Sequence, residues 1–381
     1  NMVYNVSDVQ QPVRDMMKEI GPKLQEMGRV HDRQPDAFAH DIFQFIAGKG
    51  LVGYTMPKAL GGGGRTGLEY ATLIEEIAYY DAPSSLLAAG SQLAADPIIN
   101  HANDEQKKKY IPPSASGKWI PAFALTEPNA GSDAANQSTV ATVEGDNFVI
   151  NGEKIFIMHG DVCDFAVVFC KIQEGDSRDK VSAILVPGDA PGFKKATLMN
   201  KMGMKYATTG RLWFTNVKVP KSNLMGEVGK GFKYAMQTLD GARIGIAAQS
   251  TGMARRALDE SIKYAKTRQA FGAPIAKLQA IQWMIADMAT KVAAASLLTY
   301  KAAQLQDAGT RFGLEAAQAK LFASEAANFC CDRAMQIHGG YGYIGEFTVI
   351  EKLYRDQRVS EIYEGTSEVQ RLVIAANYLR G

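Results

Sequence analysis

The apolar residues of this chain change their spacing twice, and this change limits the fold more than any other feature of the sequence. Up to about Pro113 they recur with a helical period, as in residues 68–78. From about Lys118 to Pro220 the period becomes two and β-branched residues are frequent. After Pro220 the helical period returns. The pattern predicts an α+β fold in which a β domain lies between two helical domains.

We expect an N-terminal helical domain over residues 1–117, a middle β domain over 118–225 and a C-terminal helical domain over 226–381, with long helices near 230–266, 276–308 and 312–338. The expected strands are Thr139–Val143, Phe148–Ile150, Lys154–Ile157, Phe165–Phe169, Val181–Val186 and Leu212–Val219. Asn151-Gly152 lies between two of these strands and predicts a type I′ hairpin turn.

Composition argues against several classes of function. No apolar run reaches the roughly 18 residues that cross a bilayer, so we expect no membrane span. With 42 basic and 40 acidic residues the chain has no overall field to attract nucleic acid. The four cysteines include an adjacent pair and no CxxC, which is typical of reduced thiols. The first residues lack a secretory signal, so we expect a cytoplasmic protein.

One carboxylate, Glu364, stands between Tyr363 and Gly365 just ahead of a terminal amphipathic helix. Partial desolvation beside the aromatic ring raises the pKa of a carboxyl group, and glycine lets a substrate carbonyl approach the backbone. The segment therefore suits a catalytic base. It also suits an ordinary helix start, with Thr366 or Ser367 as the capping residue.

Several separate motifs, spread over nearly the whole chain, resemble those of the acyl-CoA dehydrogenase family. Residues 361–370 are similar to its catalytic signature, and residues 123–133 to its flavin loop. The resemblance implies an FAD-dependent dehydrogenase with an N-terminal helical domain, a middle β-barrel-like domain and a C-terminal four-helix bundle. It also implies an acyl-CoA substrate and an electron-transferring flavoprotein as the partner that reoxidises the flavin.

The resemblance assigns one set of cofactor contacts to the flavin loop and to the strand that follows it. These residues are Phe123, Leu125, Thr126, Gly131, Ser132, Phe156, Ile157 and Met158. The family more often has Trp at the position of Phe156 and Thr or Ser at that of Met158. A methionine cannot donate a hydroxyl hydrogen bond to flavin N5, so an altered flavin potential is expected. Taken alone, Phe156 and Met158 also fit a core.

A second set of contacts belongs to the far end of the cofactor and to the catalytic segment. It consists of Arg268, Phe271, Leu278, Gln279, Gln336, Gly339, Gly340, Thr366 and Glu368. Arg268 offers a fork of donors for a pyrophosphate, although an exposed arginine at a helix end is common. In the family such segments contact the cofactor across a subunit interface, which implies a homotetramer.

Residues 340–345 also satisfy GxGxxG, but the residues before them have a helical pattern, so the strand that gives this motif its dinucleotide meaning is missing. A nicotinamide-dependent dehydrogenase would rest on this motif alone. His159 and His338 lack partners at ligand spacing, and we expect no metal site.

Substrate contacts implied by the resemblance are Ser132, Asp240, Arg243, Tyr363 and Gly365. We expect residues 240–243 to open a helical stretch. Some family members carry their base at the position of Ala242, which leaves Glu364 as the carboxylate at a known base position. The implied reaction removes the α proton with Glu364 and transfers a hydride from Cβ to flavin N5. A non-catalytic flavoprotein scaffold would be expected to have lost this base.

Asp96 is the second catalytic candidate. It lies on the stretch that matches the acyl-pocket helix of the family, and Gln92 shares its helix face. Asp96 can be a solvated or turn-capping residue near Pro97, or it can face the acyl group, where an acid disfavours long alkyl chains and offers a second proton acceptor. The latter pattern resembles the alicyclic branch of the family, which acts on cyclohexanecarboxyl-CoA by 1,2-elimination or on cyclohex-1-ene-1-carboxyl-CoA by 1,4-elimination in anaerobic aromatic degradation.

Overall fold

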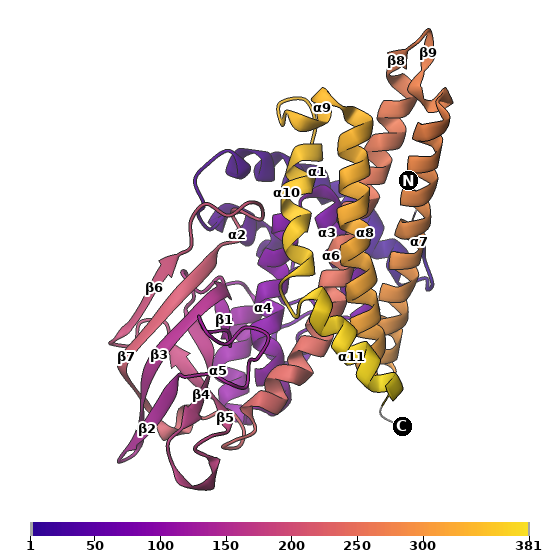
Figure 1. Ribbon diagram of the computed structural model, residues 1–381. Coiled ribbons are helices and arrows are strands. Elements are labelled where there is room, and N and C mark those ends of the chain that lie inside the picture. The colour runs from indigo at the N-terminus through magenta and orange to yellow at the C-terminus, as the bar shows by residue number, and fades with distance from the viewer. Residues whose placement is uncertain (1–2, 380–381) are drawn as a thin grey trace.

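The computed structural model describes residues 3–379, and it has helices at both ends of the chain with a β-sheet between them (Figure 1). The N-terminal helices are α1 (Gln10–Asp32), α2 (His40–Gly48), α3 (Gly67–Tyr80), α4 (Ala82–His101) and α5 (Asp104–Ala115). Capping boxes define the starts of α3 and α5: Thr66 pairs with Glu69, and Asn103 pairs with Gln106.

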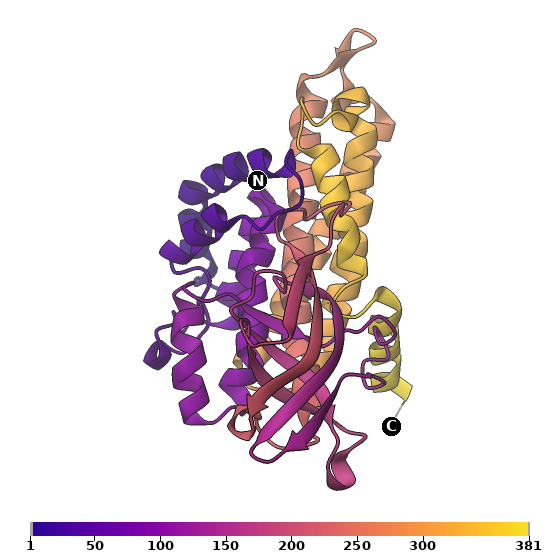
Figure 2. The ribbon, with the colours of Figure 1, turned by 90° about the vertical axis from the view of Figure 1, so that its left-hand side faces the viewer.

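Seven strands form the sheet of the middle domain. They are β1 (Pro121–Ala124), β2 (Val140–Glu144), β3 (Asn147–Met158), β4 (Phe165–Ile172), β5 (Val181–Pro187), β6 (Phe193–Thr197) and β7 (Thr209–Pro220). The neighbour order is β1-β4-β2-β3-β7-β6, and β5 also pairs with β4. Figure 2 shows that the sheet is curled, that N-terminal helices lie beside it and that the C-terminal bundle extends above it. The β domain between two helical domains is therefore confirmed.

Strand β4, in the middle domain, has a nearly continuous apolar sequence. Phe165, Val167 and Phe169 belong to a core shared with α4 and α5. Ala166 and Val168 belong to a second core enclosed by the curled sheet itself. Because both faces of the strand are covered, alternation with polar residues is absent.

The prediction of a hairpin turn at Asn151-Gly152 is wrong. These two residues lie inside β3, which runs through both of the strands expected on either side of them and pairs with β7 through a register shift between Ile150 and Gly152. The hairpin turn instead joins β2 to β3, where Glu144 pairs with Asn147 across Gly145. Gly145 has φ of 58°, the conformation that a glycine adopts at low cost in a type II′ turn.

The C-terminal part contains three long helices that lie side by side: α6 (Gly231–Thr267), α7 (Gln279–Asp307) and α8 (Gly313–His338). Shorter elements follow or join them: the hairpin of β8 (Gln269–Ala270) and β9 (Ala273–Pro274), α9 (Gly340–Tyr343), α10 (Ile350–Gln357) and α11 (Ser367–Leu379). Helix α10 packs against α8 and α6 as a short fourth helix. The three predicted long helices are confirmed to within three residues at each end.

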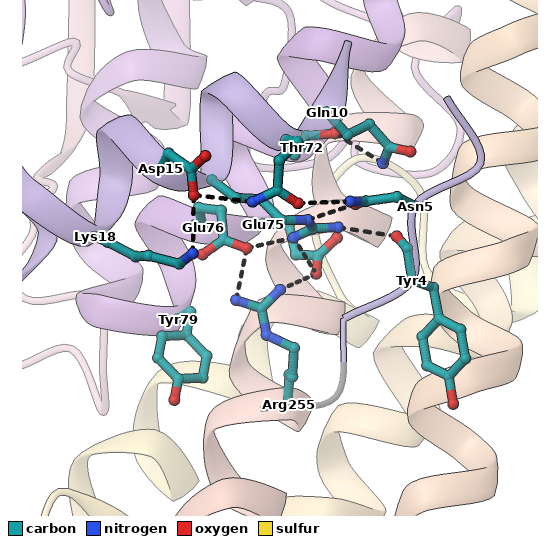
Figure 3. Close-up of polar contacts among 12 residues, drawn as sticks. Tyr4, Asn5, Gln10, Asp15, Lys18, Thr72, Glu75, Glu76, Tyr79 and Arg255 are labelled. Carbon is teal, nitrogen blue, oxygen red and sulfur yellow. Dashed lines mark hydrogen bonds and ion pairs between the residues drawn. The ribbon is translucent and has the colours of Figure 1, made fainter. Parts of the chain in front are cut away.

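A buried ionic network joins α3 to α1 and α6 (Figure 3), and a hydroxyl group of α7 also contacts it. Arg14 of α1 and Arg255 of α6 both contact Glu75 and Glu76 of α3, and the Tyr300 hydroxyl of α7 donates to Glu75. All four charged side chains are at most 6% exposed. Two arginines and two glutamates balance, which makes their burial tolerable. The network binds the N-terminal helices to the C-terminal bundle.

The expected domain boundaries fall between elements. Residues 117 and 118 lie between α5 and β1, and residues 225 and 226 lie between β7 and α6. As limits of independent domains they stay a prediction. Within residues 3–379 no helix is long and apolar enough to span a bilayer.

Candidate active site

A cavity of about 160 Å³ lies among α3, α4, α6 and the segment ahead of α11, and Glu364 and Asp96 are both on its wall. It is lined by Thr55, Gly67, Tyr70, Ala89, Gln92, Leu93, Asp96, Met158, Gly241, Ala242, Ile244, Gly245, Ile246, Gln306, Asp307 and Glu364. The structure thus brings together both catalytic candidates, the predicted cofactor residue Met158 and the alternative base position Ala242.

Glu364 is held by an unusual turn of the backbone. Its φ is 55° and that of Gly365 is 90°, which is a left-handed conformation that a residue with a side chain adopts only under constraint. Lys320 Nζ donates to the Gly365 carbonyl at 2.7 Å, and Gln370 Nε2 donates to the same oxygen at 2.8 Å. Arg243 Nε donates to the Glu364 carbonyl at 3.4 Å. The donors hold the backbone while the carboxylate faces the cavity.

The carboxyl group of Glu364 is prepared for proton transfer. Its Oε2 atom is buried and has no hydrogen-bond partner among residues 3–379. Burial raises the pKa of Glu364 to about 7, while the charges of Lys320 and Arg243 oppose this rise. A base with a pKa near the working pH is efficient, because it is largely ionised and still accepts a proton readily.

Thr366 also acts as the capping residue at the start of a helix, which was the second interpretation of this segment. Its hydroxyl accepts the backbone N–H of Val369 at 3.2 Å and so caps α11. Glu368, in the first turn of α11, is exposed. Capping by Thr366 and exposure of Glu364 to the cavity therefore occur together.

Tyr363 points away from the cavity wall. Its hydroxyl donates to Gln249 Oε1 of α6, and Gln249 Nε2 in turn donates to Ser85 Oγ of α4 at 2.7 Å. The residue anchors the catalytic segment between two helices. Its predicted contact with the substrate stays a prediction.

Asp96 is not a solvated turn residue. It lies inside α4, which continues through Pro97, and its accessible surface faces the cavity. Gln92 Nε2, one helical turn earlier, donates to its Oδ1. Burial raises the pKa of Asp96 to about 7, and the bond from Gln92 opposes the rise. The structure therefore favours the cavity-facing alternative.

The flavin loop is clamped by a residue that the sequence reasoning missed. Lys154 of β3 is completely buried, and its Nζ donates to Leu125 O at 2.8 Å, to Glu127 at 2.9 Å and to Gln137 at 3.1 Å. Glu127 also accepts the backbone N–H of Thr139. A lysine on an apolar strand was a visible signal, because such a lysine needs a buried carboxylate.

The residues assigned to the flavin ring form an exposed surface beside this loop. Phe156 is 67% exposed, has φ of 58° and lies within the register shift between Lys154 and Ile157 of β3. Ile155 N donates to Thr126 O at 3.0 Å, which joins the strand to the loop. A Cβ atom at Gly131 would meet nothing within 4 Å. An exposed ring next to an open loop fits a flat apolar cofactor, whereas Phe123, Leu125 and Ile157 have buried side chains that leave their backbone for contact.

Part of the set assigned to the far end of the cofactor lies at a second cavity, of about 500 Å³. Arg268, Gly339 and Gly340 line it, and the Arg268 guanidinium lies 5.6 Å from the centre of the Tyr341 ring. Phe271 at the tip of the β8–β9 hairpin is 96% exposed. Leu278 and Gln279, which follow this hairpin in sequence, are exposed, and so is Gln336, which precedes Gly339. Figure 1 places this hairpin at the opposite end of the bundle from β3.

Asp240 and Arg243 do not open a helix, contrary to expectation, because α6 already begins at Gly231. They form an ion pair of 2.7 Å on one face of α6, next to Gly241 and Ala242 on the cavity wall. Ser132 is exposed on the flavin loop.

The two histidines have different surroundings. The His159 ring is buried without a hydrogen-bond partner among residues 3–379, and burial lowers its pKa to about 3, so the ring is neutral. His338 Nδ1 lies 2.8 Å from the Ala334 carbonyl. No group of three or more His, Cys, Asp or Glu residues that could hold a metal occurs in residues 3–379. The GxGxxG segment follows α8 and forms α9, as its lack of a preceding strand predicted.

Comparison with known proteins gives three family models that match consecutive parts of the chain. The N-terminal, middle and C-terminal domains of acyl-CoA dehydrogenases match residues 7–118, 122–217 and 229–379. The human mitochondrial short-chain specific acyl-CoA dehydrogenase is 45% identical over 95% of this chain and 87% of its own length. Subunit CarC of the caffeyl-CoA reductase-Etf complex from Acetobacterium woodii is 44% identical over 96% of this chain and 95% of its own length.

The structure of butyryl-CoA dehydrogenase from Megasphaera elsdenii superimposes with a TM-score of 0.93, at 37% identity and with both chains covered completely. The domain matches, the identities and the shared fold agree with one another. The chain belongs to the acyl-CoA dehydrogenase family, whose members are FAD-dependent oxidoreductases that act on CH–CH bonds of acyl-CoA thioesters.

Proposed function

We propose that this chain catalyses the α,β-dehydrogenation of a short acyl-CoA thioester with Glu364 as the base. One observation carries the proposal: the Glu364 carboxyl group has a buried oxygen without a partner, on a fixed turn, at the wall of a small cavity. The geometry leaves Glu364 free to remove a proton from Cα while backbone and side-chain donors keep the turn in place.

The size of the cavity supports a short acyl group. Its volume of about 160 Å³ is below the roughly 300–1,000 Å³ of ordinary ligand pockets. Carboxyl groups on the wall also disfavour a long alkyl chain. Two relatives are named for such substrates, the human short-chain specific enzyme and the butyryl-CoA dehydrogenase of Megasphaera elsdenii.

Three parts of the chain divide the work in this proposal. The wall of α4 and α6 holds the acyl group next to Glu364 and excludes water, which strengthens the electrostatic interactions inside. Arg243 and Lys320 place positive charge near the carboxylate. The exposed surface of Phe156 and Thr126, clamped by Lys154, would hold the isoalloxazine ring. FAD, when bound there, accepts the hydride that leaves Cβ.

We assign the second cavity, with Arg268 and Gly339, to the far end of the cofactor. Because it lies beside the β8–β9 hairpin, at the opposite end of the bundle from β3, we propose that Arg268, Gly339 and Gly340 serve the cofactor of a neighbouring copy of the chain in a homotetramer. The relative CarC is named as a subunit of an Etf complex, which supports an electron-transferring flavoprotein as the redox partner. The cytoplasmic location remains a prediction.

The direction of the reaction depends on that partner. CarC is named for a reductase complex. A base that removes the α proton in one direction delivers it in the other, so the residues assigned here serve both.

A second candidate function uses Asp96 as an additional base. It is supported by the position of Asp96 on the same cavity wall as Glu364. A six-membered ring held between the two carboxyl groups could lose one proton from a ring carbon beyond Cα to Asp96, while FAD, when bound, would accept a hydride from another ring carbon. This is the 1,4-elimination of cyclohex-1-ene-1-carboxyl-CoA expected for the alicyclic branch. The relatives compared above are named for caffeyl-CoA, short-chain acyl-CoA and butyryl-CoA, so we rank it second.

Turnover of a panel of thioesters with a dye acceptor tests both candidates. Butyryl-, octanoyl-, cyclohexanecarboxyl- and cyclohex-1-ene-1-carboxyl-CoA would be supplied to the FAD-loaded enzyme. The first proposal expects butyryl-CoA to react well and octanoyl-CoA poorly. Preference for octanoyl-CoA would contradict the small cavity, and exclusive turnover of the cyclic thioesters would establish the second candidate.

A further inference from the structure

Lys320 is a buried cation beneath the catalytic turn. It lies on α8, its side chain is completely buried, and its Nζ donates to the carbonyl oxygen of Gly365, the residue after the base, at 2.7 Å. Within residues 3–379 it has no carboxylate within ion-pair distance. A lysine is rarely buried in this way without a function that offsets the loss of hydration.

Two other donors share the turn, but neither is equivalent to Lys320. Arg243 is neutralised by Asp240 at 2.7 Å. Gln370 is uncharged, although it donates to the same Gly365 oxygen at 2.8 Å. Lys320 therefore contributes the positive charge at the turn that no adjacent carboxylate compensates, and Glu364 is the acid that acts on it most strongly.

We propose that Lys320 is a positioning residue with two tasks: its ammonium group fixes the left-handed turn at Gly365, and its charge keeps Glu364 ionised and ready to accept a proton. The inference rests on the proposed function, in which Glu364 is the base. Substrate is not expected to touch Lys320, because the residue does not line the cavity.

The electrostatics of the pair agree with this arrangement. Burial lowers the pKa of Lys320 to about 8, and the charge of Glu364 opposes this change. Burial raises the pKa of Glu364 to about 7, and Lys320 is the first of the two charges that oppose it. Each group thus makes the charged form of the other less costly, and removal of either must shift its partner.

The experiment replaces Lys320 by Met, which has a similar length and no charge, and by Gln, which can still donate a hydrogen bond to Gly365. The pH dependence of kcat/KM would be measured for the FAD-loaded proteins with a short acyl-CoA. Loss of a nearby positive charge raises the pKa of a carboxyl group, so the acid limb of both variants should move to higher pH by on the order of one unit. At pH 6 the variants should therefore be on the order of tenfold less active than the parent, and at pH 9 this difference should nearly vanish.

The two neutral variants separate charge from geometry. If Lys320 only packs or holds the turn, activity falls equally at every pH and Gln restores it. An unmoved acid limb in a folded, FAD-loaded neutral variant overturns the proposal. Lys301→Met, an exposed lysine on α7, is the matched control and should leave the profile unchanged.

A reciprocal measurement does not depend on whether the Lys320 variants fold. The pKa of Lys320 would be followed by NMR of the labelled lysine side chains in the parent and in Glu364→Gln, where it should fall when the carboxylate is removed. An unchanged Lys320 titration also overturns the inference. Turnover of the same Glu364→Gln protein tests the proposed function separately: an active variant refutes the base assignment, whereas an inactive variant with unmoved Lys320 behaviour refutes only the role of Lys320.

Discussion

Asp96 of α4 and Glu364 of the segment before α11 place their carboxyl groups on the wall of one cavity of about 160 Å³. Burial raises the pKa of each to about 7. Burial also raises the pKa of Tyr70, on the same wall, and the charges of both carboxylates add to this effect. Two acids that titrate near neutrality in one small space are unusual, and perturbed groups of this kind indicate a functional site.

Replacement of Glu364 by Gln tests the base directly. The amide keeps the size of the side chain but cannot accept the proton, so we expect turnover of the best thioester to fall by about 10²–10⁴-fold. FAD content and acyl-CoA binding, followed by flavin absorbance, should stay the same. Turnover close to that of the parent would refute the assignment.

Replacement of Asp96 by Asn separates the two candidate functions. If Asp96 is a second base, the variant loses 1,4-elimination of cyclohex-1-ene-1-carboxyl-CoA and keeps the oxidation of butyryl-CoA. The products would be identified by chromatography of the CoA esters. Equal rates for parent and variant on both thioesters would leave Asp96 without a catalytic role.

The same Asp96 variant should change the pH dependence of stability. Because the folded-state pKa of about 7 lies above the ordinary value of an aspartate, the parent is stabilised by this group at low pH and loses that contribution as pH rises through 7. Asn has no such loss. The free energy of unfolding of the variant, relative to that of the parent, should therefore rise by on the order of 2 kcal/mol from pH 5 to pH 8. The measurement is the apparent Tm of both proteins at the two pH values, and a constant difference would contradict it.

Arg268→Ala should weaken the retention of FAD. The loss of one charge-assisted bond to a phosphate costs about 1.5–3 kcal/mol, which is about tenfold or more in Kd. Flavin content after gel filtration measures the effect, and Lys266→Ala, two residues earlier and also exposed, controls for the change in net charge. Equal flavin in all three proteins would exclude a contact at Arg268.

The buried network of Figure 3 predicts a large effect on stability from a single residue. Arg255→Met leaves Glu75 and Glu76 with one arginine instead of two, and an uncompensated buried charge costs about 3–5 kcal/mol. Lys18→Met removes an exposed ion pair with Asp15 in the same region and should leave stability nearly unchanged. Chemical denaturation of both variants compares them, and similar losses would mean that the network does not bind the helices together.

Features that depend on local pattern were predictable from the sequence. The three long helices and five of the strands follow from apolar spacing, and Glu364 follows from its neighbours and its resemblance to a known motif. The hairpin at Asn151-Gly152 failed because pairing with β7 outweighed a local turn preference. Strand β6 was missed because its five residues include two lysines and little apolar periodicity.

The distant partners of buried polar side chains were not predictable. Lys154 and Lys320 lie in apolar stretches of a strand and a helix, but what they bind is decided by packing between segments far apart in sequence. The position of Asp96 on the cavity wall, rather than in solvent, likewise depends on how α4 lies against α3 and α6.

The cavity wall is built in sequence order, from α3 and α4 through Met158 and α6 to Glu364, and no other lining residue follows Glu364 along the chain. During synthesis every other lining residue of the cavity therefore leaves the ribosome before Glu364 does. An incomplete chain that ends before residue 364 therefore has every other lining residue of the cavity but lacks the carboxylate that we propose as the base. The proposed chemistry thus depends on the last lining residue of the cavity to be synthesised.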